Sequence, residues 1–165
     1  MFGYRSLAFV GLALCIASML FAVLYLERTL YLDPCPLCVL DRVVIIALGV
    51  VFLFALLHGP RTVFSKIYGA ICILLSAVGI GLASRHIWLQ NLPKDQVPEC
   101  GPDLYYMLDT LPLFDVLRET LTGSGSCADI SWTFLDLTIP EQTLILFVIL
   151  LILSIFQTLL PLKSS

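Results

Sequence analysis

The chain has 165 residues, of which 59% are hydrophobic and only 13% are charged, and its mean hydropathy is +1.00. Soluble domains carry about 25% charged residues, so this composition excludes an ordinary soluble protein and predicts one domain in a lipid bilayer. The small net charge of -3 and the scattered basic residues exclude a nucleic-acid-binding surface.

Four apolar stretches are long enough to cross a bilayer, which takes about 20 residues. They cover residues 7–26, 39–57, 67–84 and 142–162. We therefore predict an all-α membrane protein, a bundle of four transmembrane helices forming a single domain over residues 1–165. The first stretch is too long for the apolar region of a signal peptide and lacks a cleavage site, so we interpret it as a membrane helix.

The loops of the predicted bundle differ in charge. An even number of helices puts both termini on one side with the turn after the second helix, and that side carries Arg5, Arg61, Lys66 and Lys163 without any acidic residue. The loops on the other side, about 27–38 and 85–141, hold every acidic residue except Asp41. Basic residues concentrate in short cytoplasmic loops, so both termini are predicted to be cytoplasmic.

A C-x-x-C motif, Cys35–Pro36–Leu37–Cys38, lies between the first two helices. Such a motif serves redox chemistry and zinc binding alike. Cys38 is expected to open the second helix, where unpaired backbone N–H groups stabilise a thiolate. Arg42 follows four residues later on the same helix face and adds a positive charge. The pattern predicts a stabilised Cys38 thiolate at the membrane edge.

His86 lies at the outer end of the third predicted helix, and a lone histidine at a membrane interface is most often an amphipathic anchor. Cys15 and Cys72 lie within the apolar stretches and are interpreted as small buried hydrophobic residues. Four tryptophan and tyrosine residues of the outer loop region are interpreted as membrane-interface residues: Trp88, Tyr105, Tyr106 and Trp132.

The long outer loop contains one amphipathic segment. Leu113, Phe114, Leu117 and Leu121 recur at helical spacing, with Pro112 before them and Gly123 after them. Proline suits the first turn of a helix and glycine its end. We predict a short helix here that lies on the membrane interface.

Cys100 and Cys127 also lie in this loop, on the same predicted side as the C-x-x-C motif. A structural disulfide between them would stabilise the fold by roughly 3–4 kcal/mol. Cys127, however, follows the flexible run Gly123 to Ser126, which favours thiol–disulfide exchange over a static crosslink. The spacing between these cysteines is too wide for a typical structural zinc site, so no metal is predicted.

At these residues the chain resembles the disulfide bond formation protein B (DsbB) family of bacterial inner-membrane quinone reductases. The shared features are four helices, the Cys35–Cys38 motif before the second helix, Arg42, and two cysteines in the last outer loop. The approach to the fourth helix is also similar, through Cys127 and Ala128 and then Trp132, Phe134 and Leu135. Two features depart from the family pattern: Asp41 replaces a longer Glu or Gln, and the surroundings of Cys100, Glu99 to Pro102, are unusual.

The resemblance implies two redox-active disulfides, Cys35–Cys38 and Cys100–Cys127. A periplasmic thioredoxin-like thiol oxidase (DsbA-like) would attack Cys100. The released Cys127 would attack Cys35, and the freed Cys38 thiolate would pass electrons to a membrane quinone, ubiquinone before menaquinone. Arg42 and His86 would bind the quinone. The activity would support disulfide formation in exported proteins, with the active cysteines on the periplasmic side of the inner membrane.

Two alternatives remain open. One is a related quinone-linked oxidase that serves a single substrate protein. The other is a non-enzymatic, tetraspanin-like scaffold, which also has four helices but should carry a Cys-Cys-Gly motif that this sequence lacks. Vitamin-K-epoxide-reductase-type proteins share the chemistry but are expected to carry C-x-x-C late in the bundle.

Overall fold

The computed structural model describes residues 3–32, 34–58, 62–93, 109–110, 112–122, 125–128, 130, 132–134 and 136–159. Among them, four helices are long and apolar enough to cross a membrane: Tyr4–Glu27, Pro36–His58, Phe64–Gln90 and Ile139–Leu159. The predicted four-helix membrane fold is therefore confirmed. Cys100, Tyr105 and Tyr106 lie outside the described residues, so the predicted Cys100–Cys127 disulfide stays a prediction.

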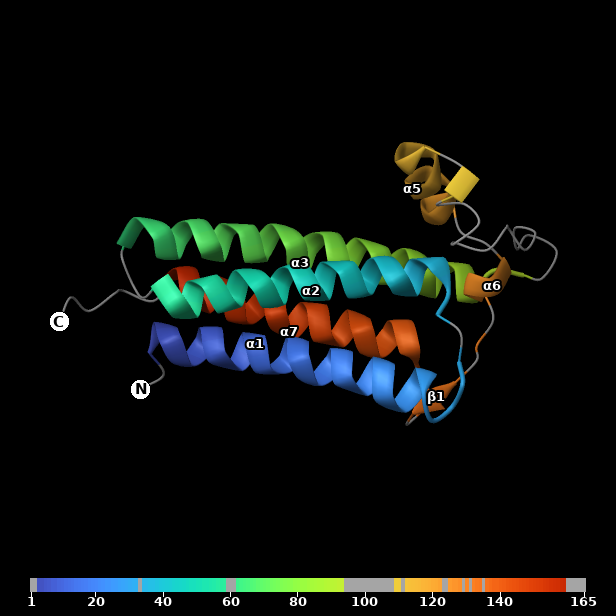
Figure 1. Cartoon of the computed structure of the whole chain (residues 1–165), viewed down its shortest axis with the longest axis horizontal. Coiled ribbons are helices and arrows are strands. Elements are labelled where there is room, and N and C mark those ends of the chain that lie inside the picture. Colours follow the sequence, from blue (N-terminus) through green and yellow to red (C-terminus); the bar gives the residue numbers. More distant parts are fainter. Residues whose placement is uncertain are drawn as a thin grey trace.

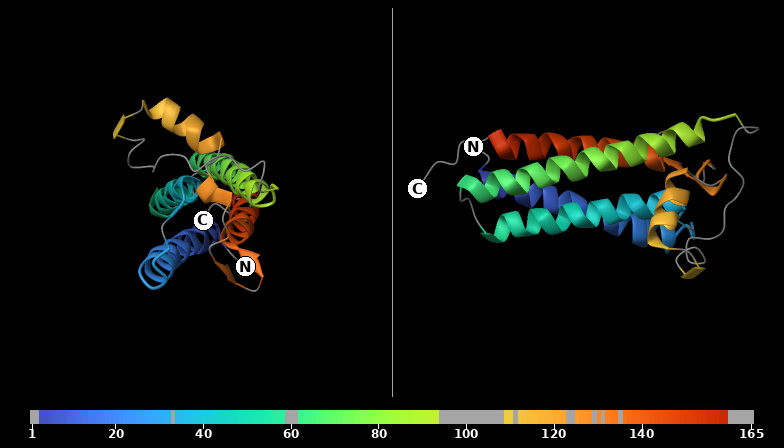
Figure 2. Two further views of the ribbon diagram at one scale, coloured as in Figure 1. Left: turned by 90° about the vertical axis from the view of Figure 1, so that its right-hand side faces the viewer. Right: turned by 90° about the horizontal axis from the view of Figure 1, so that it is seen from above.

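The bundle is built from α1 (Tyr4–Leu20) with its continuation η1 (Phe21–Glu27), α2 (Pro36–His58), α3 (Thr62–Gln90) and α7 (Ile139–Leu159). α1 packs on α2, α2 on α3, and α3 most extensively on α7. Figures 1 and 2 show the four helices running side by side, with the start of α1 and the end of α7 at the same end of the bundle.

A narrow seam of side chains joins the helices. Phe52 of α2 and Phe147 of α7 are fully buried, as are Leu48 and Leu150 one turn away from them. Large apolar side chains such as Leu74 and Phe156 are instead more than half exposed on the outside of the bundle. A soluble protein would bury such residues, and here they form the surface expected to face lipid.

The opposite end of the bundle carries the smaller elements: α5 (Leu113–Thr122), α6 (Gly125–Ala128) and a hairpin of β1 (Thr133–Phe134) and β2 (Leu137–Thr138) (Figure 1). α5 confirms the helix predicted in the long loop, and its exposed Phe114 and Leu121 are available to a membrane surface. Its position on the interface stays a prediction. The hairpin was not predicted, because each of its strands has only two residues.

Two local features orient the chain near this end. Residues Phe21–Glu27 form a π-helix, and the backbone N–H groups of Arg28 and Leu30 donate to carbonyls five residues earlier. At the start of α7, Glu141 accepts hydrogen bonds from the backbone N–H and the hydroxyl of Thr138. These two hydrogen bonds satisfy a backbone donor at the helix start and join the end of β2 to α7.

Candidate active site

The C-x-x-C motif lies where α2 begins. α2 starts at Pro36, so Cys35 is the residue before the helix and Cys38 lies within its first turn. The backbone N–H of Cys38 donates to Cys35 Sγ over 3.3 Å, and the N–H of Val39 donates to the Cys35 carbonyl. The helix was expected to open at Cys38 and to direct its N-terminal donors at the sulfur of that residue. The structure corrects this expectation, since proline at the first helical position moves the start back and the donors reach Cys35.

Three sulfur atoms meet at Cys35. Its Sγ lies 2.7 Å from Cys38 Sγ, and its side chain is also hydrogen-bonded to Cys127. Cys127 is fully buried on α6, which packs against α3. Tertiary folding thus brings one cysteine of the long loop into contact with the C-x-x-C motif, an arrangement that the sequence spacing alone could not define.

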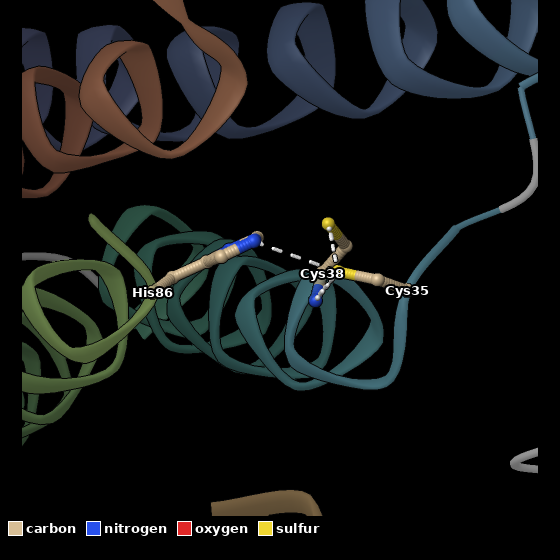
Figure 3. A group of neighbouring side chains, drawn as sticks. All are labelled: Cys35, Cys38 and His86. Carbon is tan, nitrogen blue, oxygen red and sulfur yellow. Dashed lines mark hydrogen bonds between the residues drawn. The ribbon is translucent and has the colours of Figure 1, made fainter. Parts of the chain in front are cut away.

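His86 completes this cluster from α3. His86 is only 3% exposed, and its Nε2 lies 3.7 Å from Cys35 Sγ (Figure 3). Figure 3 shows the imidazole of His86 pointing from α3 toward the two cysteines at the start of α2. His86 therefore contacts a thiol directly and is not an exposed interface anchor.

The environment of Cys35 opposes its ionisation. Hydrogen bonding to Cys127, then to Cys38, and burial all raise the pKa of the Cys35 thiol above its ordinary value. The backbone donor at the helix start acts in the other direction, but it is outweighed by two neighbouring thiols and the loss of water. Cys35 is therefore expected to be protonated or disulfide-bonded, and a poor thiolate.

A pocket of about 300 Å³ opens beside the cluster, between α1, η1, α2, α3 and α7. Cys35, Cys38 and His86 line it, together with Arg42 and Asp41. The rest of its wall is mostly apolar, and includes Trp132, which packs near Phe21 and Tyr25. A mainly apolar pocket of this size with a few polar groups is typical of a small-molecule site.

Two charged residues in the pocket wall differ from expectation. Arg42 was expected to place its charge on the helix face of Cys38; its guanidinium also forms an ion pair with Glu27 at the end of η1, which was not expected. Asp41 is 5% exposed, and its Oδ1 is buried without a hydrogen-bond partner among the described residues. A buried carboxyl oxygen without a partner is costly, which makes Asp41 a candidate for contact with a polar group of a ligand.

Some residues of the site were not found from the sequence. Glu27 could have been noticed as an acidic residue ending the first membrane helix, whereas nothing in the sequence indicated that Trp132 would reach a pocket.

The donor atoms of Cys35, Cys38 and His86 lie within 4.8 Å of one another, close enough to share a soft metal ion. Metal ligation needs thiolates, so it would compete with a Cys35–Cys38 disulfide. The prediction that the site holds no metal stays a prediction.

Fold and site together define a multi-pass membrane protein built around a cluster of cysteines suited to thiol–disulfide exchange. The family model described as disulfide bond formation protein DsbB matches residues 4–157. The chain belongs to this family, and it is a disulfide-forming oxidoreductase of the membrane.

Curated relatives agree over nearly the full length. Disulfide bond formation protein B of Saccharophagus degradans is 46% identical over 93% of this chain and 92% of the relative. The protein of that name from Nitrosococcus oceani is 46% identical over 93% and 90% of the two chains. The one from Acinetobacter baylyi is 45% identical over 94% and 91%.

Proposed function

We propose that this protein re-oxidises a soluble, thioredoxin-like dithiol oxidase and passes the two electrons through two cysteine pairs to a membrane quinone. The observation that carries the proposal is the position of Cys35 between Cys127 and Cys38. Cys35 and Cys38 line the pocket, and Cys127 reaches Cys35 from the loop side. The sulfur atoms thus stand in the order that a relay from loop to pocket requires.

The first exchange takes place in the loop. A partner thiolate attacks Cys100 of the Cys100–Cys127 disulfide, forms a mixed disulfide, and releases Cys127 as a thiolate. Because Cys127 is fully buried, a soluble protein has no access to it. Attack by the partner at Cys100 is therefore the route consistent with the burial of Cys127.

The second exchange transfers the electrons to the C-x-x-C pair. The Cys127 thiolate attacks Cys35 Sγ, the S–S bond to Cys38 breaks, and Cys38 leaves as a thiolate. The raised pKa of Cys35 favours this direction, because a thiol with the lower pKa leaves faster and Cys35 would be the worse leaving group. His86, 3.7 Å from Cys35 Sγ, is placed to accept or return a proton as these sulfur atoms exchange.

The pocket fits a quinone head group. Its wall is mainly apolar, and Arg42 offers hydrogen-bond donors for a carbonyl. In the part of the chain that the structure describes, the Asp41 Oδ1 in that wall has no hydrogen-bond partner. A bound quinone would supply a two-electron, two-proton acceptor. Cys38 is the residue that would deliver the electrons to it. The second thiolate of the partner would displace Cys100, and the partner would leave oxidised. Cys100 would then re-form its disulfide with Cys127 and release Cys35, which would re-form its disulfide with Cys38.

The orientation follows from the same scheme. The start of α2 and α6, which hold the cysteine cluster, lie at the end of the bundle opposite to the start of α1 (Figure 1). We infer that this end faces the periplasm of a bacterium and that both termini are in the cytoplasm, because a thiol oxidase needs the compartment in which disulfides persist.

The test separates the two cysteine pairs in purified protein, with a reduced thioredoxin-like dithiol protein as electron donor and a soluble ubiquinone analogue as acceptor. Cys38→Ser should lose quinone reduction by at least about a thousandfold, as for loss of a nucleophile. The donor should still attack the loop disulfide, so that one equivalent of oxidised donor forms and Cys100 and Cys127 become reduced, as detected by mass spectrometry.

Cys100→Ser should block oxidation of the donor, whereas the buried Cys72→Ala is the control and should keep wild-type turnover. Cys127→Ser should trap the donor on Cys100. If Cys100→Ser oxidises the donor at the wild-type rate, the loop pair is a structural crosslink and the relay is wrong.

A further inference from the structure

The ion pair between Glu27 and Arg42 joins two elements at the wall of the pocket. Glu27 is the last residue of η1 and Arg42 lies in the second turn of α2. A nitrogen of the Arg42 guanidinium donates to Glu27 Oε1, and the two side chains are only 19% and 28% exposed. Partial burial reduces the screening that makes most surface ion pairs weak.

The π-helix provides the geometry for this contact. A π-helix turn takes an additional residue compared with an α-helix, so it changes the direction in which every later side chain points. η1 winds in this way up to Glu27, and Leu26, the residue before it, lines the pocket. Single π-turns are frequently found at functional sites, and here the turn ends on the residue that holds Arg42.

The ion pair uses only some of the N–H donors of the Arg42 guanidinium. A guanidinium has five N–H donors in a rigid plane, and Glu27 engages one of its terminal nitrogens. Among the residues that the structure describes, no other hydrogen bond engages the guanidinium, so its remaining donors are available to the pocket that Arg42 lines with Cys38. Without an anchor, a long arginine side chain near a membrane surface extends toward water and head groups, away from the pocket.

We propose that Glu27 is a positioning residue: it holds the Arg42 guanidinium in the pocket wall, where its free donors face the Cys38 sulfur and the electron acceptor. This inference rests on the proposed function, because it gives Arg42 a part in the reaction at Cys38. Its test uses a property of the protein without any quinone, so that failure of either proposal can be recognised separately.

The test compares how the alkylation rate of Cys38 depends on pH in reduced, quinone-free protein, with each cysteine resolved by mass spectrometry. In Glu27→Ala the arginine loses its anchor. We expect Cys38 to be alkylated about three to ten times more slowly at pH 7 than in wild type, as when an opposite charge moves away from a partly exposed thiolate. Arg42→Ala should change the rate in the same direction.

The sign of this change is decisive. If Glu27 acted only through its own negative charge, Glu27→Ala would have the opposite effect. Removing an anion near Cys38 would favour the thiolate and make alkylation faster. Glu27→Gln keeps an acceptor for Arg42 and removes only the charge, so it should retain or increase the wild-type rate. In an Arg42→Ala background, Glu27→Ala should cause no further slowing.

Asp136→Asn is the matched control. It removes the same charge from the same end of the bundle, at an exposed residue of the hairpin turn, and should leave the alkylation profile unchanged. The apparent KM for a ubiquinone analogue should rise several-fold in Glu27→Ala and not in Glu27→Gln. Unchanged or faster alkylation of Cys38 in folded Glu27→Ala would overturn the positioning role, even if quinone reduction itself is demonstrated.

Discussion

Cys35 experiences two opposite influences. The backbone N–H of Cys38 donates to its sulfur at the start of α2, which alone would favour a thiolate. Contact with Cys127 and Cys38, together with burial, raises the pKa of the Cys35 thiol. In the proposed relay the raised pKa makes Cys35 a poor leaving group, so attack on Cys35 with departure of Cys38 is the favoured direction.

The raised pKa of Cys35 predicts a specific pH dependence. Only the thiolate reacts with alkylating reagents, and a raised pKa keeps the thiol protonated at pH values where an ordinary cysteine, with a pKa of about 8.5, is already half ionised. In the reduced protein, alkylation of Cys35 should therefore begin at higher pH than that of an ordinary thiol.

Cys127→Ser should move the onset of Cys35 alkylation to lower pH, because contact with Cys127 is the largest cause of the raised pKa. Cys72→Ala, in the middle of α3, should have no effect. Peptide-resolved mass spectrometry across a pH series provides the measurement. An ordinary alkylation profile for Cys35 in the wild-type protein would contradict the three-sulfur cluster.

At the scale of elements, α3 and α7 form the tightest contact of the bundle. A Cβ atom built on Gly79 of α3 would collide with the ring of Phe147, which is fully buried on α7. A Cβ atom built on Gly81, two residues later, would meet no other atom within 4 Å. Small residues that allow close approach are typical of helix contacts in membranes, and here one glycine admits an aromatic ring.

Substitution of these two glycines should have opposite consequences. Gly79→Ala should destabilise the protein by about 1–3 kcal/mol, the usual effect of overpacking a core. Gly81→Ala should be neutral or stabilising by up to about 1 kcal/mol, since alanine favours the helix. Thermal unfolding of both variants in the same detergent is the measurement, and equal melting temperatures would show that Phe147 can move aside.

At the scale of the whole molecule, charge is divided between the two ends of the bundle. Arg5 and Lys66 lie on the end where α1 and α3 begin. The opposite end carries the site with Glu27, Arg42 and Asp41. Basic residues favour the cytoplasmic side, so this asymmetry supports an orientation with the cysteines outside.

This orientation can be tested with single cysteines placed at exposed positions in a variant that lacks the six natural ones. A membrane-impermeant maleimide applied to cells with a permeable outer membrane should label Thr29→Cys, near the site. It should label His58→Cys, at the end of α2, only after the inner membrane is broken. The reverse pattern would contradict both the topology and the periplasmic function proposed here.

Much of this protein is determined locally by its sequence. A membrane helix needs only a sufficient run of apolar residues, so the four membrane helices were predictable, with ends uncertain by a few residues. α2 begins before Val39, and α3 extends to Gln90 beyond the predicted end at residue 84. The amphipathic spacing of α5 and the C-x-x-C motif are equally local, and both were recognised.

Only the tertiary structure decided which side chains meet. Cys127 contacts Cys35, and His86 contacts the same sulfur. Arg42 pairs with Glu27 at the end of the π-helix. Each of these contacts joins residues on different elements, and its geometry depends on helix rotation and on one additional residue in a helical turn. Apolar periodicity indicates that a helix crosses the membrane, but the rotation that directs a polar side chain into a pocket arises when the helices pack.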